Sequence, residues 1–316
     1  MSSRLREMAA GLGIPGAAEV QVCGATAGNE AYDYWHFLSN AHKDIFHTSI
    51  ITAEAALTGN RNDVLLLTPE NHTLAALLTW DLNMTHLVGM YPPHVLNMRA
   101  RLGHSVTLDP MVLVTGYGCL FKNIYTMYGA ANATDLTGWE IQGNRNSFER
   151  WHLILQASEP ADVATFKLLY LNEGDIGEGL EHYFNHCTLS SESIVMTDGE
   201  MIKMNGTPRL TFEDCSLIMR SDAADPMFID GTAGDGEGFI IFKNCVIHNL
   251  GTSLTYGIGS TGIAAGTDYI LVGDTSFGGC DDVIAGADEA KVWAPARVGA
   301  TEDAYHGLSL NIDQAG

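Results

Sequence analysis

Phe184-Asn185-His186-Cys187-Thr188-Leu189 returns twice further along this chain with small changes. The later copies read Phe212-Glu213-Asp214-Cys215-Ser216-Leu217 and Phe242-Lys243-Asn244-Cys245-Val246-Ile247, so the phenylalanines lie 28 and 30 residues apart. Val272–Phe277 is a divergent fourth copy, and Phe121–Thr126 is an upstream relative. A nearly fixed period of this length indicates a repeat architecture.

Within each copy, apolar side chains alternate on both sides of one interruption. In the first copy, Phe184 ends one alternating run, and Cys187 and Leu189 begin the next. Alternation with period two is typical of a half-buried strand. The residue between the runs is His, Asp or Asn, and Asn and Asp tolerate the left-handed αL conformation needed for a one-residue corner. Each copy therefore predicts a strand, a sharp bend and a second strand.

Strand–bend–strand units that recur about every 30 residues predict an all-β fold, the parallel β-helix. Equivalent residues of successive coils should then lie about 4.8 Å apart. We expect two inward stacks, one of phenylalanines and one of small side chains: Phe184, Phe212 and Phe242; Cys187, Cys215, Cys245 and Thr275. We expect a polar row at the corners: Asn123, His186, Asp214, Asn244 and Asp274. The alternative is a β-sandwich whose strands share the same alternation.

The length of the repetitive region predicts about seven to eight coils with non-repetitive termini. We expect an N-terminal arm at 1–29, a helical cap at 30–63, the β-helix at 64–287 and a C-terminal cap or contact segment at 288–316. A helix over Ser49–Leu57 would cover the open end of the tube, because an uncovered end exposes core and unpaired strand edges. At the far end we expect Trp293 to cover the exposed core.

The composition restricts the partners. The 316 residues include 38 acidic and 16 basic side chains, which gives a net charge of −22. Such a surface repels nucleic acid and anionic lipid, so we expect neither as a partner. The sequence has no run of 18 apolar residues and no secretion signal, so we expect no membrane span and assembly in a cytoplasm.

The six cysteines are expected to be free. They lie at positions 23, 119, 187, 215, 245 and 280, without a Cys-x-x-Cys pair. Three of them belong to the predicted inward stack, where a buried thiol behaves as a small apolar side chain. A reducing compartment fits this use of cysteine.

Acidic residues near the coils are the first candidates for chemistry. Neighbouring carboxylates on adjacent coils can act as an acid/base pair on a glycoside or can bind Ca²⁺. The candidates are Asp222, Asp225, Asp230, Asp235 and Glu237. Because the chain carries so many acidic residues, clusters also arise by chance, and solvated loops are the favoured interpretation.

The remaining residue types give no signature. The basic residues of the coils are scattered, which disfavours a lyase that must clamp an acidic sugar. Twelve histidines occur, among them His36, His42 and His47, but none in an H-E-x-x-H arrangement. There is no nucleophile elbow, phosphate loop or dinucleotide fingerprint. We therefore assign no catalytic, cofactor-binding or metal-binding residue from sequence and expect no cofactor.

The Phe-x-Asn/Asp-Cys-x-Ile/Leu coils resemble the pectate-lyase-like superfamily of right-handed parallel β-helices, over about residues 64–280. The segment Ser49–Leu57 ahead of Asn62–Pro69 is similar to the helix-then-strand opening of such proteins. In detail the chain is most similar to β-helix proteins among bacteriophage structural proteins. That scaffold hosts lyases, hydrolases, adhesins and virus proteins, so the resemblance is specific for fold rather than for function.

Two functional hypotheses remain open. The resemblance favours a virion structural protein on the capsid surface, a decoration or stabilising protein that is a homotrimer with capsid or other virion proteins as partners. The alternative is an enzyme, a polysaccharide-degrading tailspike or depolymerase with an Asp/Glu pair on the coil face. Glycan binding without cleavage is a third possibility. We favour the non-enzymatic hypothesis because no cationic cleft or catalytic signature is present.

Overall fold

The fold was analysed in a computed structural model of the whole chain. It describes residues 3–14, 16–24, 45–129, 136–156, 164–173, 180–191, 193–206, 208–232, 238–259, 269–284 and 292–293.

The chain folds into three sheets in which every strand pair is parallel. Sheet A has the strand order β2 (Phe46–His47), β1 (Val20–Cys23), β3 (Asp63–Leu67), β6 (Thr85–Gly89), β9 (Leu120–Lys122), β12 (Asn146–Glu149), β15 (Leu180–Asn185), β18 (Pro208–Glu213), β21 (Phe239–Lys243), β24 (Tyr269–Gly273), β27 (Val292–Trp293). Sheet B holds β4 (Asn71–Leu74), β7 (Ala100–His104), β10 (Ile124–Tyr128), β13 (His152–Leu155), β16 (Thr188–Ser190), β19 (Ser216–Met219), β22 (Val246–Asn249), β25 (Ser276–Gly278). Sheet C holds β5 (Leu78–Trp80), β8 (Val112–Val114), β11 (Thr137–Ile141), β14 (Lys167–Asn172), β17 (Glu200–Asn205), β20 (Met227–Thr232), β23 (Leu254–Ile258), β26 (Cys280–Ile284).

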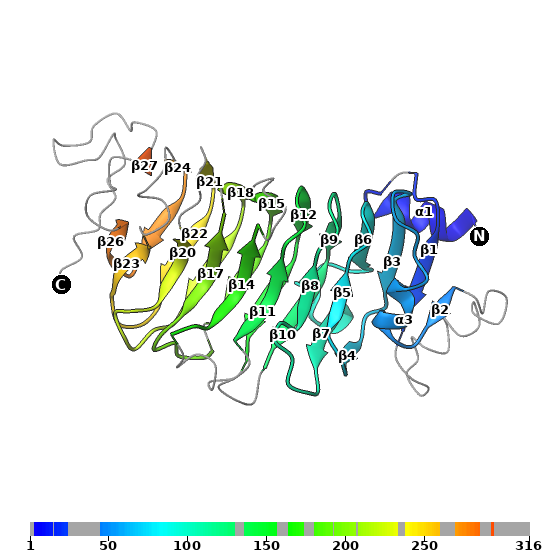
Figure 1. Cartoon of the computed structure of the whole chain (residues 1–316), viewed down its shortest axis with the longest axis horizontal. Coiled ribbons are helices and arrows are strands. Elements are labelled where there is room, and N and C mark those ends of the chain that lie inside the picture. Colours follow the sequence, from blue (N-terminus) through cyan, green and yellow to red (C-terminus); the bar gives the residue numbers. More distant parts are fainter. Residues whose placement is uncertain are drawn as a thin grey trace.

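From β3 onward, each coil runs once through sheets A, B and C, so consecutive strands along the chain lie in different sheets. Figure 1 shows the coils side by side along a rod, with the N-terminal helices at one end. Sheets B and C contain eight strands each, which agrees with the predicted seven to eight coils. The right-handed parallel β-helix is therefore confirmed, and the β-sandwich alternative is excluded.

The phenylalanine stack is present and longer than the sequence indicated. Phe148 lies in register between Phe121 and Phe184, and the row continues to Phe212 and Phe242. Successive ring centroids are 5.1, 4.8, 4.7 and 5.3 Å apart, and the rings are nearly parallel. All five side chains have no exposed surface. Stacked aromatic rings therefore form the central row of the core.

The three thiols of the second inward row are free and buried. Cys187 donates to the carbonyl oxygen of Phe148 at 3.3 Å, and Cys245 donates to that of Phe212 at the same distance. Cys215 makes the equivalent bond, and the hydrogen bond with the Cys187 thiol, together with burial, raises the pKa of Cys215. Each thiol thus links its own corner to the phenylalanine of the preceding coil, and the row is structural, as expected.

The corner residues adopt the αL conformation, as predicted. The φ values of Asn123, His186, Asp214, Asn244 and Asp274 lie between 47° and 57°. The backbone N–H groups of the first four donate to the next coil, for example from His186 to Glu213 O at 2.9 Å, so the bend leaves the ladder intact. Arg150 occupies the same corner with φ 48° and was not foreseen, because arginine is not a typical αL residue.

The N-terminal region covers the first coil. The helix α3 (Ile50–Glu54) buries Ile50 and Ala53 in the main core, as expected for a cap. The helix α1 (Ser3–Gly11) lies at the same end of the rod (Figure 1). The described residues of the predicted N-terminal arm pack on the body, because β1 pairs with β3 and Leu5 and Ala9 are buried against that part of sheet A. Val20 and Val22 are apolar and alternate, so they are suited to extend the sheet.

The other end is described only in part. β27 adds to sheet A beside β24, while the side chain of Trp293 and residues 294–316 lie outside the described part. The boundaries at 29, 63 and 287 remain predictions. In the described part, no helix has the length and apolar character required to cross a bilayer.

Replacing Phe212 by alanine should destabilise the fold by about 3–5 kcal/mol, because a cavity would open between two stacked rings. Phe212→Leu should cost much less, since Leu87 occupies this row beside Phe121. The measurement is chemical denaturation followed by circular dichroism. Thr211→Ala, on the outer face of the same strand, is the control, and a similar loss there would contradict the role of the stack.

Replacing Arg150 by asparagine should stabilise the protein by about 1 kcal/mol, since a side chain with little tolerance for the αL region costs about that much there. Arg150 is exposed, and Asn123 and Asn244 show that asparagine fits this corner. Arg150→Ala removes the same charge without relieving the backbone. The two variants should therefore differ in denaturation midpoint, and equal midpoints would show that the corner is not strained.

Candidate functional site

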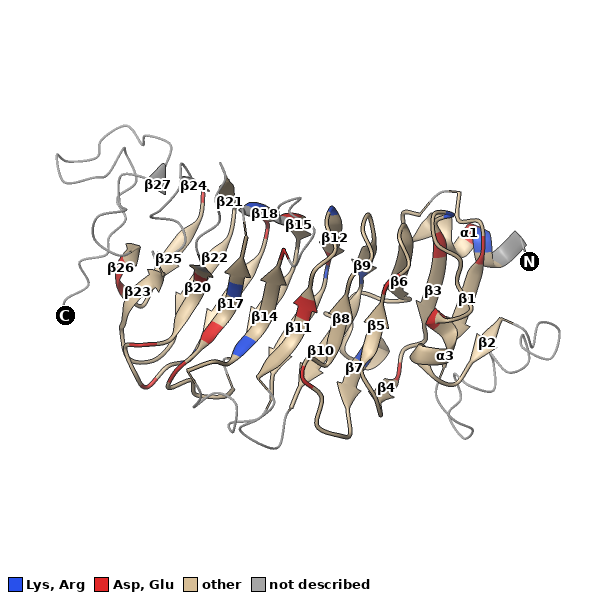
Figure 2. Ribbon diagram, viewed as in Figure 1, with Lys and Arg blue, Asp and Glu red and all other residues tan. Residues whose placement is uncertain are grey.

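The outer face of sheet C carries a connected group of partly buried charges. Glu140, Tyr170, Lys203 and Asp230 lie in register on four successive strands, β11 to β20. Figure 2 shows acidic and basic residues interspersed along these strands. We call this row, together with Glu200 of β17, the sheet C strip.

Lys203 lies at the centre of the strip between two carboxylates. Its Nζ donates to Oε1 of Glu200 at 3.2 Å and to Oδ2 of Asp230. The side chain of Lys203 is 23% exposed, that of Glu200 15% and that of Asp230 11%. The ion pairs are therefore partly shielded from solvent. Glu200 and Lys203 share the outer face because both residues between them, Met201 and Ile202, point into the core.

The surroundings shift the pKa values of two of these groups. Burial raises the pKa of Glu200, although Lys203 opposes the shift. Burial lowers the pKa of Lys203, but the hydrogen bond and charge of Asp230 and the charge of Glu200 more than compensate, so it is raised overall. Gly259 makes room for Asp230, since a Cβ at this glycine would overlap the carboxylate.

Amide and carboxylate groups fill the rest of this face. Glu140 Oε1 accepts from Gln142 and from Asn172, each at 2.8 Å. Asn205 donates in turn to Asn172 at 2.9 Å. The chain of bonds runs from coil to coil, so these groups satisfy one another and hold neighbouring coils in register.

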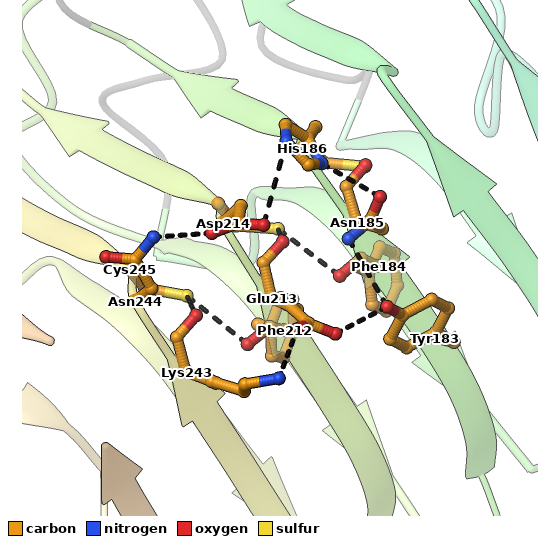
Figure 3. A network of polar contacts seen from close by, with 12 residues as sticks. Tyr183, Phe184, Asn185, His186, Phe212, Glu213, Asp214, Lys243, Asn244 and Cys245 are labelled. Carbon is orange, nitrogen blue, oxygen red and sulfur yellow. Dashed lines mark hydrogen bonds and ion pairs between the residues drawn. The ribbon is translucent and has the colours of Figure 1, made fainter. Parts of the chain in front are cut away.

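A second polar network follows the corner between sheets A and B, and Figure 3 shows it in detail. Asp214 accepts from Asn244 Nδ2 at 2.5 Å and lies 3.6 Å from Nε2 of His186. These are three of the predicted corner residues. They form a ladder in which each coil contacts the next.

Glu213 is the centre of the adjacent row on sheet A. It accepts from Lys243 and, at 2.6 Å, from the hydroxyl of Tyr183. The hydrogen bonds from Lys243 and Tyr183 lower the pKa of Glu213, and the bond to Glu213 raises the pKa of Tyr183 to about 12. Lys122 and Glu149 form another ion pair in the same row. Lys122 and Lys243 thus share one position of sheet A with acidic and amide residues between them, and they form no cationic row.

The predicted acidic candidates do not form one site. Asp222 and Asp225 are exposed in the connection before β20, whereas Asp230 is buried within that strand and paired with Lys203. Asp235 and Glu237 lie outside the described residues. Among the described residues, no group of three or more His, Cys, Asp or Glu could hold a metal ion.

Cys23 and His72 form a thiol–imidazole contact near the N-terminal end. Cys23 Sγ lies 3.8 Å from Nδ1 of His72, whose Nε2 lies 2.9 Å from the carbonyl oxygen of Thr68. Burial and the charge of Glu70 raise the pKa of the thiol to about 12. A nucleophilic cysteine needs a lowered pKa, so this contact is a structural one. His47 is paired with Gln21, and His36 and His42 lie outside the described residues.

Sequence reasoning selected Asp230 but missed Glu140, Glu200 and Lys203. A usable signal existed, because Lys203 and Asp230 are 27 residues apart, close to one coil. The signal was hidden because sheet C has no sharp residue pattern comparable to the Phe-x-Asn-Cys corner. Without the register, nothing in the sequence connects Glu140 to this row.

Comparisons with known proteins show the fold. The pectin methylesterase of Aspergillus niger is similar with a TM-score of 0.52 and 14% identity, over 93% of this chain and 90% of that one. A mutant pectin methylesterase in complex with a hexasaccharide matches with a TM-score of 0.47 and 11% identity, over 89% and 90% of the two chains. No protein-family model and no curated protein matches the chain. The chain thus shares its fold, a right-handed parallel β-helix, with the pectin methylesterase of Aspergillus niger.

Proposed function

We propose that this chain is a bacteriophage virion structural protein with a non-catalytic β-helix body that decorates or stabilises the capsid surface. The observation that carries the proposal is the mutual satisfaction of polar groups from coil to coil. Lys203 is bonded to both carboxylates beside it, and Glu213 is held by Lys243 and Tyr183. A catalytic acid or base needs a group free to exchange a proton with substrate.

The ladders make the body rigid. Aromatic stacking, thiol–carbonyl bonds and charged rows all connect adjacent coils, so local opening has to break several interactions together. A rigid rod with little loop ordering is suited to reinforcing a shell. Its six buried free cysteines are compatible with assembly in a host cytoplasm, where thiols remain reduced.

The proposed partners follow from this role. They are capsid or other virion proteins and further copies of the same chain, with a homotrimer as the expected assembly. The net charge of −22 disfavours nucleic acid and anionic lipid as partners.

Binding to capsids tests the proposal. The purified chain, mixed with capsids of the phage that encodes it but assembled without it, should sediment with them and saturate at a number set by capsid symmetry. The capsids should also withstand higher temperature when decorated. The pectin methylesterase of Aspergillus niger is a control with the same fold. Capsids that neither bind the chain nor gain stability would overturn the proposal.

A second candidate function is action on polysaccharide, which the sheet C strip and the names of the similar structures favour. Glu200 has a raised pKa, as a general acid requires, and Asp230 is a second carboxylate bound to the same ammonium. Two carboxylates bridged by one lysine lie within about 6 Å of each other, near the separation of about 5–5.5 Å found in retaining glycosidases.

Activity assays separate the two candidates. If the strip is catalytic, the chain should release reducing ends from bacterial exopolysaccharides or methanol from methyl-esterified pectin. Asp230→Asn and Glu200→Gln should then each lower the rate at least about a hundredfold. Asp225→Asn is the matched control in the exposed connection. A wild-type chain that is inactive on a broad glycan panel would exclude this candidate.

A further inference from the structure

Sheet B differs in charge from the other two sheets. None of its eight described strands contains an aspartate, a glutamate or a lysine, and Arg101 is the one arginine. Sheet A carries Glu149 and Glu213 on its strands, and sheet C carries Glu140, Glu200 and Asp230. Eight described strands without an acidic residue are a strong bias on a chain with net charge −22.

The outward residues of sheet B form one continuous row in register. The row consists of Asn71, Arg101, Tyr125, His152, Thr188, Ser216, Val246 and Ser276. These side chains are half-buried or exposed, and Val246 is 44% exposed. We call this row and the insertion 91–99 beside it the sheet B face.

A cationic and aromatic cluster lies at the N-terminal half of this face. The guanidinium of Arg99 lies 4.3 Å from the ring centre of Tyr125, whose ring is 5.9 Å from that of His152. Arg99 Nε is buried with no hydrogen-bond partner among the described residues. None of the eight ion pairs of the described part includes Arg99.

Exposed apolar side chains surround the cluster. Leu96 is 59% exposed, Tyr91 is 40% and Val95 is 37%. All three belong to the insertion 91–99, which contains the short helix η1 (Leu96–Met98). Arginine, tyrosine and exposed apolar groups around a poorly solvated centre are typical of the anchor region of a protein interface.

Charge and size both indicate which partner fits. Two copies with net charge −22 repel each other, and the repulsion is least where one copy presents no carboxylate. The strand face alone spans about 38 by 13 Å at strand spacing, or about 500 Å². The insertion 91–99 enlarges it toward the roughly 800 Å² that each partner buries in a stable interface.

We propose that the sheet B face docks a second copy of this chain, with Arg99 receiving a carboxylate from an acidic surface of that copy. The two contacting surfaces differ, so the contact is heterologous, and repetition around an axis closes a ring. The sheet B face is thus the surface for the self-association that the proposed function includes, and in this respect it rests on that function. Capsid binding is a separate property and is measured separately.

The mass in solution tests this surface. The wild-type chain should sediment as a multiple of its 34.0 kDa mass. Arg99→Glu and Ser216→Glu, both on the sheet B face, should raise the dissociation constant about thirtyfold or more. Arg209→Glu and Thr211→Glu make the same charge changes on sheet A and should leave the mass unchanged. Circular dichroism and thermal melting confirm that each variant is folded.

The outcomes are distinct. A wild-type chain that remains at 34.0 kDa at all concentrations overturns the proposal, as do sheet B variants that still associate like wild type. If the wild type is monomeric and only the sheet B variants lose capsid binding, the occupant is a virion protein rather than a second copy. If the chain associates through sheet B and binds no capsid, the proposed function fails and this inference stands.

Discussion

The structure depends on side chains of successive coils lying directly above one another. Parallel pairing fixes the strands at about 4.8 Å, close to the spacing at which aromatic rings stack favourably. The rings of Phe148, Phe184 and Phe212 follow this spacing at 4.8 and 4.7 Å. Backbone pairing and side-chain packing therefore favour the same register. A slip of one residue would turn the entire row outward.

The αL corner makes this register possible. One residue such as Asn244 or Asp214 redirects the chain from sheet A to sheet B, and its N–H still donates to the next coil. The thiol that follows fills the narrow inner side of the bend and bonds to the phenylalanine of the preceding coil. The corner, the thiol and the stacked ring thus act as one unit.

With the core fixed in this way, the three outer faces can differ. Sheet C carries paired carboxylates around Lys203, the corner beside sheet A carries a ladder through Asp214, and sheet B carries no acidic residue on its strands. Each face repeats along the rod, because every coil contributes one strand to each sheet. Such a body presents three extended surfaces of different charge to its surroundings.

The sequence alone determined the coil architecture, the inward rows at Phe212 and Cys215 and the corners from Asn123 to Asp274, because these rest on local alternation and on αL tolerance. It did not reveal that Phe148 belongs to the phenylalanine stack and Arg150 to the corner row. In that coil Trp151 stands where the clear copies have cysteine, so the repeat pattern is not recognisable. The Glu200–Lys203–Asp230 group, the docking of β1 on β3 and the unpaired Arg99 Nε came only from tertiary structure. These contacts depend on which residues of neighbouring coils come into register. The connections between strands differ in length, so the local sequence does not show that register.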